Sequence, residues 1–210
     1  MNRVIDIIFS DIKKDKSIYI SLIIVVIISL LFGAFFIKIL KSSDLKLVLE
    51  HINTYFNNIK NSNIKFNLYN NIINNNITLF ILWILGFSVI GLPLIISILF
   101  YKGFTLSFTV TSLIYNFKFN GIFFSLVYIF PHLILNLLFY FVMTYYSFKL
   151  CLNIIQVLFN KNRINKSFIK KYIVVLLISI IFLSLSAVYE TYILPYLIKI
   201  IYWYSKFVVK

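Results

Sequence analysis

Long runs without a charged residue are the feature of this sequence that most constrains its fold. Residues 17–37, 77–101 and 121–145 contain no Asp, Glu, Lys or Arg, and residues 173–193 contain only Glu190. About 20 apolar residues are enough for a helix to cross a hydrocarbon core about 30 Å thick. Because lipid offers no hydrogen bonds, such a segment must pair its backbone groups internally, as an α-helix does. The sequence therefore predicts an all-α, polytopic membrane helix bundle.

The composition agrees with a chain that is solvated by lipid. Hydrophobic residues make up 61% of it and charged residues 12%, against about 45–50% and about 25% in soluble domains. The formal net charge is +14, but the basic residues flank the uncharged runs, for example at Lys13, Lys14 and Lys16 and again between residues 161 and 171. This distribution favours contact with lipid headgroups over nucleic acid binding. We expect a multi-pass protein of the cell membrane.

One shorter segment decides the expected number of crossings. Residues 103–117 would extend only about 22 Å as a helix, so they form either a short or tilted span or a segment that enters and returns. Basic residues beside membrane spans are retained on the cytoplasmic side. Five crossings place the N-terminal basic group and the 161–171 group together on that side, whereas four would separate them.

We therefore expect about five transmembrane helices in a single integral membrane domain, residues 1–210. The expected layout is a cytoplasmic N-terminus (1–16), span 1 (17–37), an extracytoplasmic segment (38–76), span 2 (77–101), a short span 3 (103–117), span 4 (121–145), a cytoplasmic basic segment (146–171), span 5 (173–193) and a tail (194–210).

The extracytoplasmic segment is predicted to contain one amphipathic helix followed by an Asn-rich loop over residues 61–76. Its apolar residues recur at the i, i+3, i+4, i+7 spacing of one helix face; they are Leu45, Val48, Leu49, Ile52, Tyr55, Phe56 and Ile59. Ser43 or Asp44 could cap its start. Two interpretations stay open. The helix lies in the membrane interface, or its apolar face, chiefly Leu45, Leu49, Ile52, Tyr55 and Phe56, docks an extracytoplasmic partner.

No motif of an enzyme is found in the chain. His-Glu-x-x-His, Gly-x-Ser-x-Gly and a Walker-type loop are all missing from the sequence, which argues against metalloprotease, serine hydrolase and nucleotide-binding chemistry. Cys151 is the single cysteine, so an internal disulfide and a multi-cysteine metal site are excluded. We interpret Cys151 as a small apolar residue of a helix. We expect no catalytic residue, metal, cofactor or small-molecule substrate.

Two ionisable residues lie inside predicted spans. His132 follows Pro131, and Asn136 comes one turn later on the same helix face, while Glu190 lies toward the outer end of the last span. Because burying such groups in a membrane is costly, they are candidates for function. The blander interpretation is that they pair with neighbouring helices and set the packing. The alternative is a small transporter or channel component with a polar site at His132 and Asn136.

Small residues recur every four positions in the short third span, at Gly103, Ser107 and Thr111. A helix face of this kind lets a neighbouring helix approach closely. Packing within the chain is the default interpretation, and a partner helix is the alternative.

Gly86, Gly91 and Pro93 predict a kink or break in the second span, and Pro131 predicts a kink in the fourth. Backbone groups freed at such a break must be satisfied by neighbouring helices or by a wet cavity.

Two runs carry a resemblance to a known family. Residues 83–93 read Trp-Ile-Leu-Gly-Phe-Ser-Val-Ile-Gly-Leu-Pro, and residues 101–109 read Tyr-Lys-Gly-Phe-Thr-Leu-Ser-Phe-Thr. Together they resemble the membrane core of the stage II sporulation protein M family. In that family a Gly-x-Pro span is followed by a Lys-Gly or Asn-Gly turn and a short helix rich in small residues.

The next span of the family carries a Pro-His or Pro-Gln pair, which Pro131 and His132 match. Many wider relatives continue as Pro-His-Gly-x-x-Glu. This chain has Leu133 and Asn136 at the positions of that Gly and Glu, so a role that depends on them does not carry over.

The resemblance implies a non-enzymatic scaffold of endospore formation. Such proteins anchor and localise peptidoglycan hydrolases, the stage II sporulation proteins D and P, at the sporulation septum and the engulfing mother-cell membrane. The first partner cleaves glycan strands and the second removes stem peptides. Their combined action remodels septal peptidoglycan during engulfment of the forespore.

Overall fold

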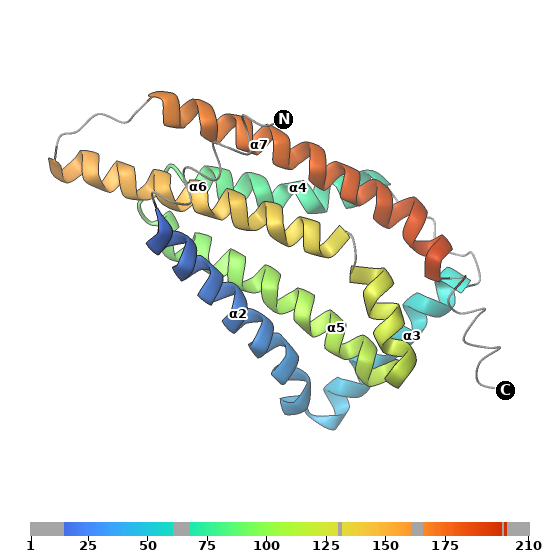
Figure 1. The fold of residues 1–210 in the computed structure, drawn as a ribbon. Coiled ribbons are helices and arrows are strands. Elements are labelled where there is room, and N and C mark those ends of the chain that lie inside the picture. The colour runs from blue at the N-terminus through green and yellow to red at the C-terminus, as the bar shows by residue number, and fades with distance from the viewer. Residues whose placement is uncertain (1–14, 61–67, 130–131, 161–165, 199, 201–210) are drawn as a thin grey trace.

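The computed structural model describes residues 15–60, 68–129, 132–160, 166–198 and 200 (Figure 1). All regular elements in this part of the chain are helical, as predicted. They are α2 (Lys16–Ile39), α3 (Ser42–Lys60), α4 (Leu68–Leu85), α5 (Gly91–Ile129), α6 (His132–Asn160), α7 (Lys166–Val188) and the π-helical turn η1 (Tyr189–Ile193).

Within these residues, four helical stretches are long and apolar enough to cross a membrane: Lys16–Ile39, Gly91–Leu126, His132–Phe159 and Lys166–Ile198. The prediction of a membrane protein made of helices is therefore confirmed.

The bundle has two distinct ends. One holds the start of α2, the turn between α4 and α5, and the facing ends of α6 and α7; we call it the turn end. The other carries α3, and we call it the α3 end. Helix α2 lies along α5, and α4 packs against α6 and α7. In Figure 1 the α2–α5 pair and the α6–α7 pair are closest at the turn end and diverge toward the α3 end.

The structure corrects the second predicted span. Residues 77–101 are not one helix, because α4 ends at Leu85 and α5 begins at Gly91, and the turn between them reverses the chain. A side chain on Gly91 would collide with the Leu85 carbonyl group, so this tight reversal needs glycine. Pro93 lies in the first turn of α5, where its missing N–H leaves no helical hydrogen bond unmade. The glycines and the proline therefore mark a helix end and a helix start.

The short third span is also corrected. Residues 103–117 continue the helix that starts at Gly91, and their apparent boundary is Lys102, a charge that the structure places inside the helix. The helix bends sharply at Lys118, whose φ of 51° and ψ of −125° are not helical, and it then resumes. The backbone turns back closely enough there that a side chain on Gly121 would collide with α5 itself.

The fourth predicted span, residues 121–145, is interrupted as well. It covers the last turns of α5 and the first half of α6, which starts at His132. Pro131 itself lies outside the described residues. Residues 146–160, which were predicted to belong to a cytoplasmic segment, continue α6.

Half of the predicted Asn-rich loop is helical. Residues 68–76 form the first half of α4, and residues 61–67 lie outside the described part of the chain. The sequence suggested a loop because it is polar, but two of these asparagines, Asn71 and Asn76, find partners on η1 and α7. Asn76 is 7% exposed and hydrogen-bonds Ser184.

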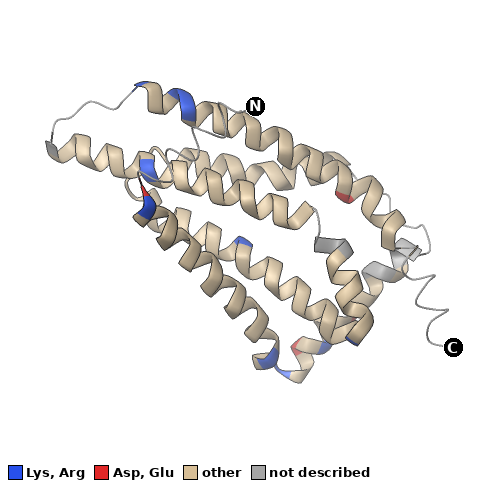
Figure 2. Cartoon of the chain, in the orientation of Figure 1, with Lys and Arg blue, Asp and Glu red and all other residues tan. Residues whose placement is uncertain are grey.

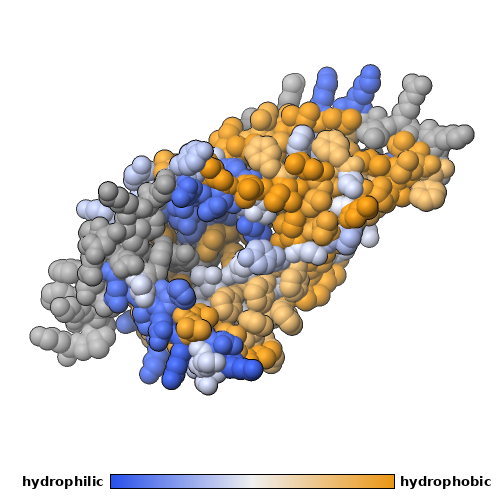
Figure 3. Space-filling model, turned by 180° about the vertical axis from the view of Figure 1, so that it is seen from behind, coloured by the Kyte–Doolittle hydropathy of each residue, from blue (hydrophilic) through white to orange (hydrophobic). Residues whose placement is uncertain are grey.

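Large apolar side chains fill the core and also cover the outside. The core includes Leu82 of α4, Leu99 of α5, Met143 of α6 and Leu183 of α7. Outward-facing residues such as Leu31, which is 65% exposed, are equally apolar. Figure 3 shows apolar side chains over much of one face, with hydrophilic ones gathered toward the α3 end and beside a hollow. Such a surface suits hydrocarbon and not water.

Candidate functional site

The turn between α4 and α5 is held by α6 and α7. Gly86 lies against Ser147 of α6 and the Tyr172 hydroxyl of α7, and a side chain there would have no room. The Tyr172 hydroxyl donates to the Trp83 carbonyl at 2.8 Å and lies 3.0 Å from the Ser147 hydroxyl. One buried tyrosine thus satisfies a carbonyl that the end of α4 leaves without an intrahelical partner.

Cys151 has a role in the same turn. Its buried Sγ lies 3.5 Å, 3.4 Å and 3.2 Å from the carbonyl oxygens of Leu85, Gly86 and Ser88. The prediction placed Cys151 in a helix as a small apolar residue, and it does lie buried in α6. The structure adds that the Leu85 and Ser88 carbonyls already accept backbone N–H groups, so the single thiol hydrogen is best used by the Gly86 carbonyl, as a weak bond in a buried site.

An ion pair joins α2 to α6 at the turn end. Lys149 of α6 pairs with Asp15, the residue immediately before α2. Tyr145 donates its hydroxyl to the same carboxylate at 2.7 Å. The Lys149 and Asp15 side chains are only 18% and 20% exposed. The contact fixes where α2 enters the bundle.

The small-residue face of α5 lies against α2. Gly103 touches Ser29, where a side chain on the glycine would collide with the serine hydroxyl. Ser107 donates its hydroxyl to the Leu30 carbonyl at 2.6 Å, and Thr111 donates within α5 to the Ser107 carbonyl at 2.9 Å. The close approach that the spacing predicted is therefore made within the chain.

The polar face of α4 lies along α7. Asn71 donates to the Thr191 hydroxyl at 3.2 Å, and Asn76 donates to the Ser184 hydroxyl at 3.2 Å. Glu190 lies in η1 beside Thr191, and the Asn75 amide nitrogen is buried without a hydrogen-bond partner among the described residues. The two hydrogen bonds let Asn71 and Asn76 face the bundle, because a buried amide needs partners.

His132 and Asn136 contact different neighbours. The buried His132 ring stacks obliquely on Tyr189, with ring centroids 5.7 Å apart, and its carbonyl accepts a bond from Ser186 of α7. Asn136 is also buried, but it lines a cavity between α4, α5 and α6. The two residues thus share a helix without forming one polar site.

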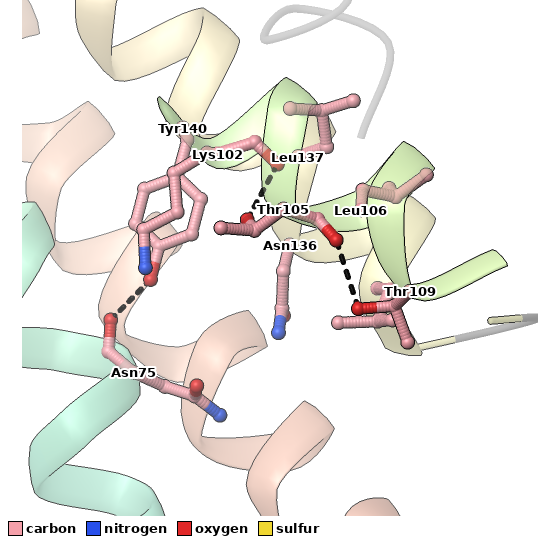
Figure 4. Close-up of a pocket in the computed structure, with 9 residues that line it drawn as sticks. Asn75, Lys102, Thr105, Leu106, Thr109, Asn136, Leu137 and Tyr140 are labelled. Atoms are coloured by element: carbon pink, nitrogen blue, oxygen red, sulfur yellow. Dashed lines mark hydrogen bonds between the residues drawn. The ribbon is translucent and has the colours of Figure 1, made fainter. Parts of the chain in front are cut away.

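That cavity has a volume of about 160 Å³ (Figure 4). It is lined by Asn75, Lys102, Thr105, Leu106, Thr109, Leu133, Asn136, Leu137 and Tyr140. The Lys102 ammonium lies 4.6 Å from the centre of the Tyr140 ring, and the Tyr140 hydroxyl donates to the Asn75 carbonyl at 2.6 Å. The cavity wall therefore carries several polar groups and one cation among apolar side chains.

Helix α3 lies across the α3 end with its two faces in different surroundings. Leu45, Leu49 and Ile52 are half-buried, and the polar face is exposed. Asn116 of α5 donates to Asn53 of α3 at 2.8 Å, which ties the two helices together. The side chains of Tyr55 and Phe56, also predicted to belong to the docking face, lie outside the described part.

A comparison with models of known protein families shows which family this chain belongs to. The model of the family described as stage II sporulation protein M matches residues 22–195, which run from α2 to just past η1. This chain belongs to the stage II sporulation protein M family. No curated protein and no solved structure matches it.

Family membership makes this a sporulation-related membrane protein and confirms the resemblance seen in the sequence. One detail expected for the stage II sporulation protein M family is different here. Lys102 and Gly103, expected to form a turn, lie in the middle of α5. Gly103 serves the contact with α2 instead, because its missing side chain lets the two backbones approach.

Four residues that hold the bundle together or line the cavity were not predicted from the sequence: Asp15, Lys102, Lys149 and Tyr172. Lys102 had the clearest signal, since it is the one charged residue between Gly91 and Phe117. The other three become notable only when segments far apart in the sequence are placed together.

Proposed function

We propose that this protein is a non-enzymatic membrane scaffold of endospore formation. In this role it anchors and localises peptidoglycan hydrolases, the stage II sporulation proteins D and P, for septal wall remodelling and forespore engulfment. The observation that carries the proposal is the family match over residues 22–195. The matched region is a helical bundle in which polar side chains such as Tyr172, Ser107 and Asn76 join one helix to another, as a structural anchor requires.

We also propose that five helices cross the membrane: α2, α4, α5, α6 and α7. Helix α4 has 18 residues, about 27 Å of helix, and its Asn71 and Asn76 bond to Thr191 of η1 and Ser184 of α7. Lys16, Lys149, Lys166 and Lys170 then lie at the turn end, and Lys38, Lys41 and Lys46 lie at the α3 end (Figure 2). Because basic residues occur at both ends, we propose the orientation that keeps the N-terminal basic group and the 161–171 group together in the cytoplasm, with the turn end inside and α3 outside.

Labelling of single cysteines tests this topology. With Cys151 replaced by Ser, a cysteine is introduced either by Ser43→Cys at the start of α3 or by Ser88→Cys in the α4–α5 turn. A membrane-impermeant maleimide added to intact cells should modify the first variant and spare the second until the cells are opened. Labelling of the Ser88→Cys variant in intact cells would reverse the assignment.

Helix α3 is the part of the scaffold that we assign to partner contact. It lies on the proposed outer side, where hydrolases of the cell wall act. Its apolar residues Leu45, Leu49 and Ile52 are only half-buried, so part of that face remains open to a partner. The interfacial interpretation predicts instead that this face meets only lipid.

Co-purification from sporulating cells separates these interpretations. The wild-type chain should recover the stage II sporulation proteins D and P, Leu49→Asp should lose them, and Asn57→Asp should retain them because that side chain is on the exposed face. Equal amounts of each variant in the membrane fraction show that the charge did not block insertion. Failure of the wild-type chain to recover either hydrolase, together with normal septal thinning in a deletion strain, would overturn the scaffold proposal.

The transporter or channel alternative depended on a polar site shared by His132 and Asn136. Because His132 contacts Tyr189 while Asn136 lines the cavity, that shared site is not formed. Spore formation that is unchanged by His132→Ala would remove the rest of its support.

A further inference from the structure

Lys102 is a cation placed deep in a membrane helix. Helix α5 begins at Gly91, 11 residues before Lys102, and continues without a break as far as Lys118. A lysine near a helix end can extend its ammonium to the interface. A lysine in the middle cannot do so as easily, and an intramembrane charge of this kind is costly unless something offsets it.

The bundle offsets this charge only in part. The ammonium lies over the Tyr140 ring at 4.6 Å, a cation–π contact that contributes about 0.5–2 kcal/mol. Within the described residues, Lys149 forms an ion pair with Asp15, whereas Lys102 forms none with any carboxylate. Glu190 makes no ion pair with Lys102. The ammonium therefore keeps donors to spare.

The space beside Lys102 can hold a ligand. The cavity of about 160 Å³ is much larger than the roughly 10–15 Å³ that one water needs on the same measure, so it has room for a phosphate-sized group and some water. Thr105, Thr109 and Asn136 supply polar lining (Figure 4). The Oδ1 atom of Asn136 is buried and has no hydrogen-bond partner in the described part of the chain. The Nδ2 amide of Asn75, in the same lining, is also buried without a partner among the described residues. It is a donor that suits a phosphate oxygen, whereas the Asn136 oxygen suits a donor such as a headgroup hydroxyl or a water.

The surroundings indicate where the ligand comes from. Leu106, Leu133 and Leu137 border the same cavity, so its wall is polar on one side and apolar on the other. The lining residues Leu106, Leu133 and Leu137 are themselves partly exposed, so the cavity reaches the apolar outside of the bundle. An amphiphile in the bilayer could place its charged group beside Lys102 and its chains along that surface.

We propose that this cavity binds a phosphate group held by the Lys102 ammonium, and that a phospholipid headgroup supplies it. An ammonium binds phosphate through charge-assisted hydrogen bonds, which are stronger than neutral ones. The proposal is independent of the scaffold role, because a bound lipid could stabilise the bundle whether or not hydrolases dock on α3.

Native mass spectrometry of the purified full chain in detergent tests it. The chain is titrated with phosphatidylglycerol, with diacylglycerol as the phosphate-free control lipid and with inorganic phosphate as a competitor. One phosphatidylglycerol should bind each chain ahead of any others, and diacylglycerol should not. Competition by inorganic phosphate would assign the site to free phosphate, whereas no competition would assign it to the lipid headgroup.

Variants then link the binding to Lys102. Lys102→Met should weaken phosphatidylglycerol binding about tenfold, the loss expected for one charge-assisted bond, and Lys102→Arg should retain it. Lys170→Met removes the same charge from an exposed position on α7 and should leave binding unchanged. Asn136→Leu keeps the cation but fills the cavity, and it too should reduce binding. Equal binding by the wild type and Lys102→Met, or equal loss in Lys170→Met, would overturn the proposal.

Discussion

The turn end and the cavity differ in whether their charged groups and freed backbone carbonyls find partners. At the turn end, Tyr172 and Cys151 satisfy the carbonyls where α4 stops, and Asp15 pairs with Lys149. Around the cavity, Lys102 has no carboxylate partner in the described chain and Asn136 keeps an unbonded oxygen. The same chain therefore gives polar groups partners where the helices must be held together, and leaves some without partners at the cavity, where a ligand could use them.

The largest expected effect is at Gly86. Gly86→Leu would drive a side chain into Tyr172 and Ser147, and overpacking of this kind should cost about 3 kcal/mol. We expect the folded, monodisperse fraction in detergent to fall sharply in size-exclusion chromatography. Ser88→Leu, at an exposed position of the same turn, is the control. Similar losses in both variants would mean that the turn is not closely packed.

Tyr172 should come next. Tyr172→Phe removes the donor to the Trp83 carbonyl and the contact with Ser147, which should cost about 1–2 kcal/mol because a buried acceptor is left unpaired. Unfolding by titration with SDS, followed by circular dichroism, measures the free energy of unfolding. Tyr101→Phe removes the hydroxyl of a tyrosine that is 61% exposed and should have no effect. Equal stability of Tyr172→Phe and the wild type would count against the closed turn end.

The ion pair should contribute less, because both partners are partly exposed. In a double-mutant cycle, Asp15→Asn and Lys149→Met should each cost about 1 kcal/mol, and the double variant should cost less than the sum. The same SDS titration supplies the free energies, and high salt should weaken the coupling. Glu50→Gln, at an exposed site of α3, is the control. Fully additive effects would show that the two residues do not interact in the folded protein.

The cavity should give the smallest effect on stability. Asn136→Leu replaces a side chain whose oxygen has no partner, so the free energy of unfolding should change by about 0.5 kcal/mol or less, in either direction. Asn76→Leu is the contrast, because it breaks bonds to Ser184 and the Ile72 carbonyl and should destabilise by about 1 kcal/mol. A large loss of stability in Asn136→Leu would mean that Asn136 has partners in the folded protein, as Tyr172 does at the turn end.

Many residues of the candidate site could be predicted from the sequence, but the contacts between them could not. Gly103 and Ser107 were identified by their spacing, and they do lie at a close helix contact. His132 and Asn136 were identified as buried polar residues, and both are buried. Their shared helix face suggested a single site, however, and the structure divides them between two neighbours. Spacing along one helix shows which side chains share a face, but not what lies opposite.

The sequence by itself determined that this protein is a bundle of membrane helices of the stage II sporulation protein M family, because uncharged length and short motifs are properties of single segments. The tertiary structure decided where those helices begin and end. A proline and two glycines that looked like a kink became a reversal between α4 and α5, and asparagines that looked like a loop became part of α4. The reason is that a polar group inside a membrane is acceptable only when a partner is near, and here the partners come from distant segments such as Tyr172 and Cys151.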